Sequence, residues 1–203
     1  MSLRETLEAY QKNDPAARGK FEIFWLYNGL HAVIYYRAAH WLYAHKLRFI
    51  GRWISQFARR RTGVEIHPAA KIGRRLVIDH GTGVVIGATA EIGDDCLLYQ
   101  GVTLGGTGKK YEKRHPTLGN NVMVGCGAKV LGPFKVGDNA RIAANSVVLH
   151  EVPPNSTVVG VPGSVVRING EKLDHAKTPD PVRTQLEDLA RRLADLEEKM
   201  EAK

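Results

Sequence analysis

The sequence predicts an α+β protein, in which an α-helical region precedes a parallel β-helix of about four coils and a C-terminal helix. Three observations support this prediction. Twelve of the fifteen aromatic residues lie in residues 1–62, and within residues 63–168 an aliphatic residue returns at every sixth position. In residues 169–203 that period is lost, and leucines recur at alternating spacings of three and four. These three ranges are the expected regions of the chain.

The aromatic-rich region at residues 1–62 has the signals of helices. Asp14 is expected to be an N-cap, because its carboxylate can accept from free backbone N–H groups, and Pro15 suits the first helical position. The run Arg59–Arg61 is expected to be a solvated helix end favoured by the helix dipole, rather than a nucleic-acid site. Aromatic residues at loose helical spacing are expected to be core. They are Phe21, Trp25, Tyr35, Trp41, Tyr43, Trp53 and Phe57.

The period of six in the second region fits neither a helix nor an ordinary strand. A helix repeats its apolar residues at three and four, and a half-buried strand repeats them at two. A strict six with Gly, Asp or Asn beside the apolar residue is the hexapeptide repeat of a parallel β-helix. No single turn buries its own apolar face, so the coils must stack. The apolar positions are Ile66, Ile72, Ile78, Ile86, Ile92, Leu98, Leu104, Leu118, Val124, Val130, Val136, Ile142 and Val148.

Two interruptions stand out in this repeat, the pair Thr82–Gly83 and the longer insert from Gly108 to His115. A loop that leaves a regular solenoid and returns is a common place for binding groups, because the scaffold holds both of its ends. Glycine, Asn and Asp at the remaining corners suit a backbone that needs positive φ.

The third region follows Pro179 and Pro181 and predicts a short amphipathic helix with charges between its apolar positions. Two alternatives stay open for it. The helix packs on its own subunit, or it forms a short coiled coil between subunits, since two heptads are marginal alone. Its apolar positions are Leu186, Leu189, Leu193, Leu196 and Met200.

The composition is that of an ordinary globular chain of 203 residues, with 43% hydrophobic and 25% charged residues. The net charge of 29 − 21 = +8 favours acidic partners but does not choose among them. Two cysteines, Cys96 and Cys126, provide no disulfide framework, and no signal peptide or bilayer-spanning stretch is recognisable. We therefore expect a cytoplasmic protein that binds neither nucleic acid nor membrane.

The pair Asp79–His80 is the first candidate for chemistry, because it precedes the Thr82–Gly83 interruption at a corner. The strand that follows His80 should stack on the strand that carries Glu65, and neighbouring layers of a β-helix lie roughly 4.8 Å apart. A carboxylate there could hold the His80 ring in one tautomer and stabilise its cation, which makes His80 a candidate general base. The alternative is a polar corner that is simply hydrogen-bonded.

A second candidate cluster lies at the end of the insert, where Arg114 could bind a carboxylate or phosphate and His115 could hydrogen-bond it. The glycines around Thr107 could let an extended ligand lie close to the chain, or could serve loop flexibility alone. Metal binding is not expected, because no two of the repeat-region histidines have the short ligand spacing of a zinc site. These histidines are His67, His80, His115 and His150.

Several segments together resemble the serine O-acetyltransferase family of hexapeptide-repeat acyltransferases, in its short form. The likeness extends over about residues 12–168. The segments are NDPAAR at 13–18, EIHPAAKIG at 65–73, DHGTG at 79–83, VTLGGTGK at 102–109, RHP at 114–116 and GVPG at 160–163.

This resemblance implies a left-handed β-helix, with homotrimers or dimers of trimers that have active sites between neighbouring subunits. It implies that serine takes its acetyl group from acetyl-CoA, with no further cofactor, in the first step of cysteine biosynthesis. His80 would be the general base, with Glu65 as its orienting carboxylate where the family commonly has Asp. The other implied ligands are Asp14 and Asp79 for the serine ammonium, Arg114 and His115 for its carboxylate, and Gly106, Cys126 and Gly127 for acetyl-CoA.

Relatives often end in a tail whose last residue, Ile, inserts into O-acetylserine sulfhydrylase, whereas this chain ends at Glu198–Lys203, which argues against that complex. Two other functions stay open. One is acetyl transfer to a sugar or another hydroxyl or amine, with His115 as the base. The other is a non-enzymatic scaffold that recruits a partner through its C-terminal heptads. Asp14–Pro15 and Asp79–His80 favour the serine enzyme over the first of these.

Overall fold

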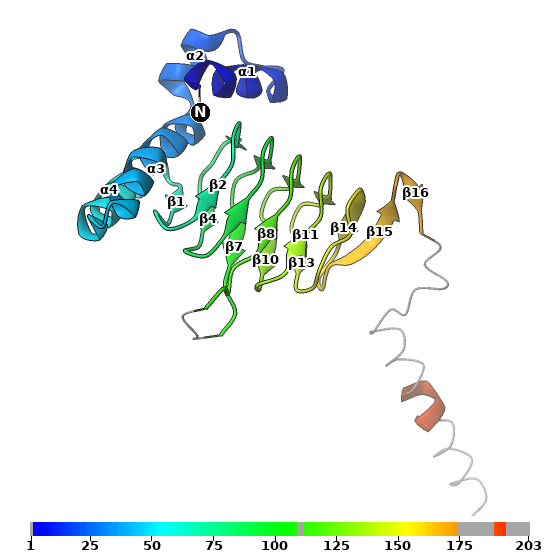
Figure 1. Ribbon diagram of the computed structural model, residues 1–203. Coiled ribbons are helices and arrows are strands. Elements are labelled where there is room, and N and C mark those ends of the chain that lie inside the picture. The colour runs from blue at the N-terminus through cyan, green and yellow to red at the C-terminus, as the bar shows by residue number, and fades with distance from the viewer. Residues whose placement is uncertain (1, 109–111, 174–188, 194–203) are drawn as a thin grey trace, which may run out of the picture. The chain divides into compact units, whose positions relative to one another are not determined.

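A computed structural model describes residues 2–108, 112–173 and 189–193 (Figure 1). The chain divides into two compact units, Met1–Gly170 and Glu171–Lys203, and each is described by itself. None of the described helices is long and apolar enough to cross a membrane. The first unit opens with four helices: α1 (Leu3–Asn13), α2 (Lys20–Leu26), α3 (Asn28–Ala44) and α4 (Arg48–Thr62).

The rest of the first unit is a parallel β-helix with one short strand in each predicted hexad, so this prediction is confirmed. Its strands form three sheets that run along the stack (Figure 1). The first sheet contains β1 (Glu65–Ile66), β4 (Val85–Ile86), β7 (Thr103–Gly105), β10 (Lys129–Leu131) and β13 (Val147–Val148). The second contains β2 (Lys71–Ile72), β5 (Glu91–Ile92), β8 (Thr117–Leu118) and β11 (Lys135–Val136). The third contains β3 (Val77–Ile78), β6 (Leu97–Leu98), β9 (Met123–Val124), β12 (Arg141–Ile142) and β14 (Ser156–Val159).

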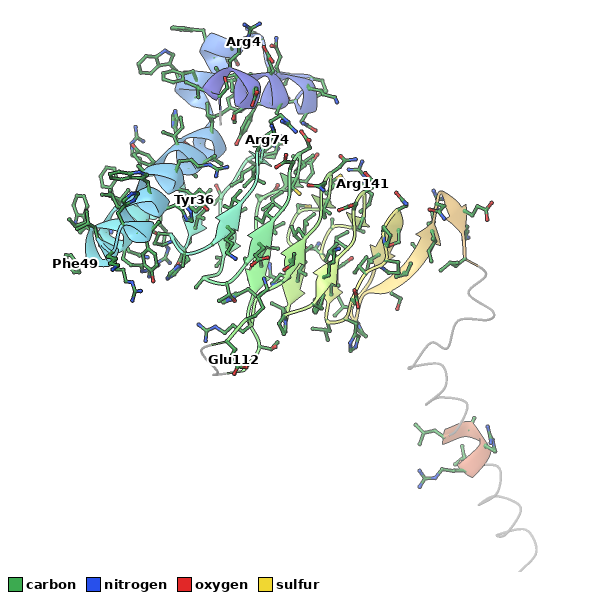
Figure 2. The ribbon with its side chains drawn as sticks, in the orientation of Figure 1. Arg4, Tyr36, Phe49, Arg74, Glu112 and Arg141 are labelled. Carbon is green, nitrogen blue, oxygen red and sulfur yellow. The ribbon has the colours of Figure 1, made fainter. Side chains whose placement is uncertain are left out.

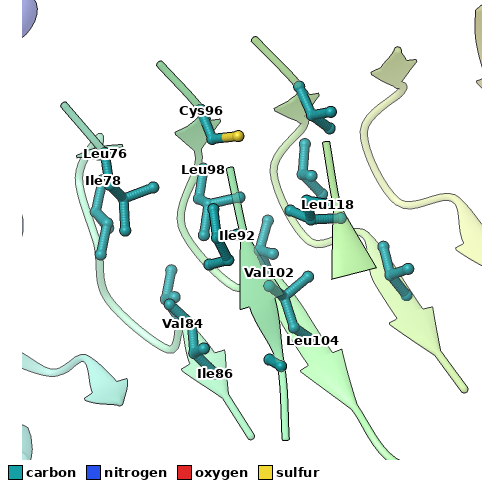
Figure 3. Close-up of a cluster of buried hydrophobic side chains, with 14 of the residues drawn as sticks. Leu76, Ile78, Val84, Ile86, Ile92, Cys96, Leu98, Val102, Leu104 and Leu118 are labelled. Carbon is teal, nitrogen blue, oxygen red and sulfur yellow. The ribbon is translucent and has the colours of Figure 1, made fainter. Parts of the chain in front are cut away.

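The core of the β-helix is a column of buried side chains that contains the sixth-position residues and also apolar residues two positions before them, such as Leu76 and Cys96 (Figure 3). All thirteen predicted positions are buried. Burying one such side chain contributes about 1.5–3 kcal/mol, so the column is the main source of stability. Cys96 lies inside this column, where burial raises the pKa of its thiol to about 11, and both cysteines are free.

The free edge of the first coil is covered by side chains of α3 and α4. The Ser55 hydroxyl donates to the Ile66 carbonyl over 2.7 Å, and the Tyr36 hydroxyl donates to the Ala70 carbonyl over 2.6 Å. Figure 2 shows Tyr36 on the helix beside the first coil. The Arg37 guanidinium donates to the Ile72 carbonyl over 2.8 Å. These carbonyls have no further coil to pair with, and a buried unpaired carbonyl is costly, so the helices stabilise the end of the stack.

At the other end, β14 pairs antiparallel with β15 (Ser164–Ile168) after a turn that contains the cis peptide Val161–Pro162. The second unit contains β16 (Glu171–Lys172) and a helical turn at residues 189–193, in which Leu189 and Leu193 are exposed. The other three apolar positions of the expected C-terminal helix lie outside the described residues.

Two predictions for the helical region were wrong. Asp14 is not an N-cap: it is the C-cap of α1, and the chain turns through residues 15–19 before α2 begins. Most of the aromatic residues expected in the core are exposed, because they lie on outward faces of the helices; these are Phe21, Trp25, Trp41, Trp53 and Phe57. Arg59–Arg61 do form the exposed last turn of α4, which ends before Gly63 in the left-handed conformation, as predicted.

Candidate active site

Three of the predicted site residues, Asp14, Asp79 and His80, line one cavity of about 280 Å³. Asp14 comes from the turn after α1, and the other two come from the corner that follows β3. Tyr27 and Asn28, at the start of α3, line the same cavity. The structure thus brings together residues that are more than sixty positions apart in the sequence.

The corner after β3 places the His80 side chain in the open. His80 has a φ of 59° and Gly81 a φ of 79°, so the chain leaves the strand sharply through two left-handed residues. The His80 N–H donates to Asp79 Oδ1 over 2.9 Å, while His80 Nε2 lies 4.0 Å from Asp79 Oδ2. The His80 side chain is 71% exposed and that of Asp79 is 22% exposed. The imidazole is therefore accessible and lies next to a carboxylate.

Asp14 is held as a carboxylate by two donors. The Tyr27 hydroxyl donates to Asp14 Oδ2 over 2.5 Å, and the Ala16 N–H donates to Asp14 Oδ1 over 2.8 Å. These hydrogen bonds, that of Tyr27 first and that of Ala16 second, lower the pKa of Asp14. The same bond raises the pKa of Tyr27 to about 12, so Tyr27 stays a donor. Two carboxylates, those of Asp14 and Asp79, therefore line the cavity, which suits a small cation such as an ammonium group.

Glu65 begins β1, which pairs with β4, the first strand after the His80 corner. Its Oε2 lies 3.2 Å from Arg59 Nε at the end of α4. Among the described residues no hydrogen bond or ion pair joins Glu65 to His80. The role of Glu65 beside His80 stays a prediction.

Arg114 and His115 lie at a different corner of the β-helix, between the first and second sheets. His115 is buried, with 7% of the residue exposed, and its ring lies over Gly87, where a Cβ atom would come within 2.0 Å of Nε2. Burial is the main cause that lowers the pKa of His115, followed by the charges of Arg114 and Lys113. His115 is therefore neutral near pH 7.

Thr89 holds this second cluster. Its Oγ1 accepts the backbone N–H of Arg114 over 3.0 Å and that of His115 over 3.1 Å, and it lies 2.8 Å from His115 Nδ1. Its carbonyl accepts from Lys113 Nζ over 2.6 Å. The stem of Arg114 packs over Gly106, where a Cβ atom would lie 3.0 Å from Arg114 Cγ. The base of the insert is thus fixed on the coil below it; residues 109–111 of the insert lie outside the described chain.

The predicted site residues fall on two edges of the β-helix. We call the first the His80 edge (the corners at residues 79–84, 99–102 and 125–128) and the second the His115 edge (the corners at residues 67–70, 87–90, 106–108 and 112–116). Cys126 and Gly127 share the His80 edge, whereas Gly106 shares the His115 edge. The Gly127 N–H already donates to the Gln100 carbonyl over 2.8 Å. The first sheet separates the two edges, so one chain does not bring all of these residues together.

The structure describes no group of three or more His, Cys, Asp or Glu side chains placed to hold a metal ion in residues 2–108, 112–173 and 189–193. His67, which is half-buried on the His115 edge, lies near the positive charges of Arg52 and Arg114. Burial first, then Arg52, lowers the pKa of His67 to about 4.

Sequence reasoning did not find Tyr27 or Thr89. Tyr27 lies among many aromatic residues, and only its contact with Asp14 sets it apart. Thr89 occupies an ordinary hexad corner, and its contacts lie about 25 residues further along the chain. No local pattern of the sequence marks either residue.

The fold is that of a hexapeptide-repeat transferase, and the family model for bacterial transferase hexapeptides (six repeats) matches residues 115–150. Serine acetyltransferase of Bacillus subtilis is 51% identical over 203 residues, covering 98% of this chain and 94% of the relative. The chain therefore belongs to the serine acetyltransferase family, and hence to the acyltransferase enzymes.

Two solved structures agree with this assignment. Serine acetyltransferase of Neisseria gonorrhoeae in complex with serine has a TM-score of 0.79 and 39% identity, covering 81% of this chain and 67% of that one. Serine acetyltransferase of Brucella abortus in complex with coenzyme A has a TM-score of 0.79 and 41% identity, covering 81% and 66%. This chain thus spans about two thirds of the length of those solved chains.

Proposed function

We propose that this chain transfers the acetyl group of acetyl-CoA to the hydroxyl of L-serine, giving O-acetylserine and CoA, the first step of cysteine biosynthesis, in the cytoplasm. The observation that supports this most is the cavity in which two carboxylates flank an accessible imidazole. An amino acid offers an ammonium group to those carboxylates and a hydroxyl to the imidazole. Relatives that carry the same name, one of them in complex with serine, support the choice of acceptor.

His80 is the general base of the proposed reaction. Its imidazole removes the proton from the serine hydroxyl as the serine oxygen attacks the thioester carbon, which forms a tetrahedral oxyanion. The C–S bond then breaks, and the imidazolium returns the proton to the departing sulfur, so CoA leaves as a thiol. General-base assistance of this kind contributes about 10²–10⁴ in rate. Glu65 would orient the ring and stabilise its cation.

Asp14 and Asp79 would bind the serine ammonium, because both carboxylates face the cavity beside His80. Arg114 and His115 would bind the serine carboxylate, but they lie on the His115 edge. The proposed site is therefore completed by the His115 edge of a neighbouring subunit, as in a homotrimer or a dimer of trimers. Holding serine at both ends supplies orientation, which is a large part of such a rate enhancement.

Acetyl-CoA would lie along the coils with its pantetheine arm near Gly106, Cys126 and Gly127, and the reaction needs no other cofactor. Glycine leaves room for a ligand to approach the backbone closely. No described residue bonds to the backbone N–H or carbonyl of Gly106, which leaves both groups for a ligand. The groups near Cys126 and Gly127 are already used within the coils: the Cys126 carbonyl accepts from Asn145.

The test is thiol release from acetyl-CoA by the purified full chain, with serine, homoserine and simple sugars as acceptors. We expect release with serine to exceed that with every other acceptor. Release with a sugar but not with serine would contradict the proposal and favour the sugar acetyltransferase. Release with none of them would remove the enzymatic function and favour the scaffold.

A further inference from the structure

We propose that Thr89 is a positioning residue that fixes His115 as a neutral ring with its proton on Nε2, ready to donate to a carboxylate. This inference rests on the proposed function, in which His115 binds the carboxylate of serine. Thr89, at a corner of the coil, would determine the tautomer of the His115 ring, which follows it by 26 residues in the sequence.

The hydrogen-bonding capacity of the Thr89 hydroxyl is used completely. A hydroxyl has one donor and two acceptor positions. Both acceptor positions are filled by backbone donors, the N–H groups of Arg114 at 3.0 Å and of His115 at 3.1 Å. The contact of 2.8 Å with His115 Nδ1 must therefore use the hydroxyl proton, so Thr89 donates and Nδ1 accepts.

A second donor confirms the direction of this bond. The backbone N–H of Thr89 also points at His115 Nδ1, over 3.3 Å, and a backbone N–H can only donate. A proton on Nδ1 would face this N–H and would also turn the hydroxyl away. The only place left for the proton of a neutral ring is Nε2.

The surroundings of the ring agree with this assignment. Burial of the ring first, then the charges of Arg114 and Lys113, lower the pKa of His115 and so oppose a second proton on the ring, and the half-buried His67 nearby has a pKa lowered to about 4. Nε2 has no hydrogen-bond partner among the described residues, so it is the donor that remains for a ligand. The ring can pack against Gly87 only because glycine has no Cβ, since a Cβ atom at this position would collide with the ring. A fixed donor suits a carboxylate and costs no reorganisation on binding.

The test compares Thr89→Val, which keeps the shape but loses the hydroxyl, with Thr89→Ser, which keeps the hydroxyl. Thr157→Val on β14 is the matched control. The full chain is labelled with ¹⁵N-histidine, and the His115 signals are assigned by their loss in His115→Gln. We expect wild type, Thr89→Ser and the control to show a protonated Nε2 and a bare Nδ1. We expect Thr89→Val to show a mixed tautomer and a KM for serine raised about tenfold, with kcat changed less, because the His115 ring then presents its Nε2 proton to the ligand for only part of the time.

A merely structural threonine would change thermal stability without changing the tautomer. An unchanged tautomer and KM in Thr89→Val would therefore overturn the inference. If that variant does not fold, the wild-type spectrum decides, since a proton on Nδ1 overturns the inference by itself. Failure of the proposed function is distinguishable, because it would appear as wild-type protein without serine-dependent thiol release, whatever the spectrum shows.

Discussion

The two histidines of the proposed site are held in opposite ways. The His80 side chain is 71% exposed, and its Nε2 lies 4.0 Å from Asp79 Oδ2. His115 is buried over Gly87, and Nδ1 receives two donors from Thr89. The difference fits the role that we propose for each ring. A base has to meet the substrate and change its protonation state, whereas a binding group works best when its proton and its orientation are set before the ligand arrives.

The largest expected effect is that of removing the His80 ring. His80→Ala should lower kcat at least a hundredfold because the general base is lost, while assembly survives because the side chain is 71% exposed. Steady-state thiol release and size-exclusion chromatography measure the two properties. The control is His150→Ala, another exposed histidine, which should keep wild-type turnover. Near-normal turnover in a well-folded His80→Ala variant would refute the base assignment.

Removing the Arg114 guanidinium should act on binding instead of turnover. Arg114→Ala should raise the KM for serine about tenfold or more and change kcat less, because a hydrogen bond to a charged group contributes roughly 1.5–3 kcal/mol. Initial rates over a range of serine concentrations test this, with Arg141→Ala on β12 as the control. If only the KM for acetyl-CoA changed, the insert would serve the other substrate.

Glu65 should have a smaller effect. Glu65→Gln should lower kcat about tenfold and shift the pH profile of kcat/KM, if the carboxylate stabilises the His80 cation. Arg59→Gln breaks the pair of 3.2 Å with Glu65 but keeps the acid. It should retain activity and lose less than about 1 kcal/mol of stability, since the pair is partly exposed. Equal activity loss in both variants would mean that the ion pair matters only for structure.

The smallest expected effect concerns pH and the His115 edge. The pKa of His67 is lowered to about 4, below the value of roughly 6.5 for an unfolded chain. Between about pH 4 and pH 6.5 the His67 ring is therefore neutral in the folded chain and takes up a proton on unfolding. The free energy of unfolding is highest above about pH 6.5 and falls as the pH drops towards 4. Allowing for partial exposure, the loss between pH 7.5 and 5 is about 1 kcal/mol.

Denaturant unfolding at fixed protein concentration measures this slope. His67→Gln should flatten it, and His150→Gln should leave it unchanged. A slope that persists in His67→Gln would place the proton uptake on another group.

The repeat could be predicted from the sequence because every coil is local: the sixth-position residues, from Ile66 to Val148, mark their own strands. Asp79 and His80 could be singled out for the same reason, since they directly precede the Thr82–Gly83 interruption of the repeat. Asp14 was identified as a site residue through the resemblance, but its prediction as an N-cap was wrong. Its carboxylate accepts from Tyr27, thirteen residues along the chain, and a local sequence pattern does not show such a contact. Exposed aromatics such as Trp53 were misassigned, because periodicity identifies an apolar face but not whether anything covers it.

The hydrogen bonds from Ser55, Tyr36 and Arg37 to the first coil have one more consequence. A β-solenoid ends in an open strand edge, and such an edge is a template on which another molecule can add itself, with fibre growth as the outcome. Side chains of α3 and α4 donate to the carbonyls of the first coil, so these carbonyls are not free to pair with a strand of another molecule. Removing α3 and α4 would therefore expose this edge and lower the solubility of the chain.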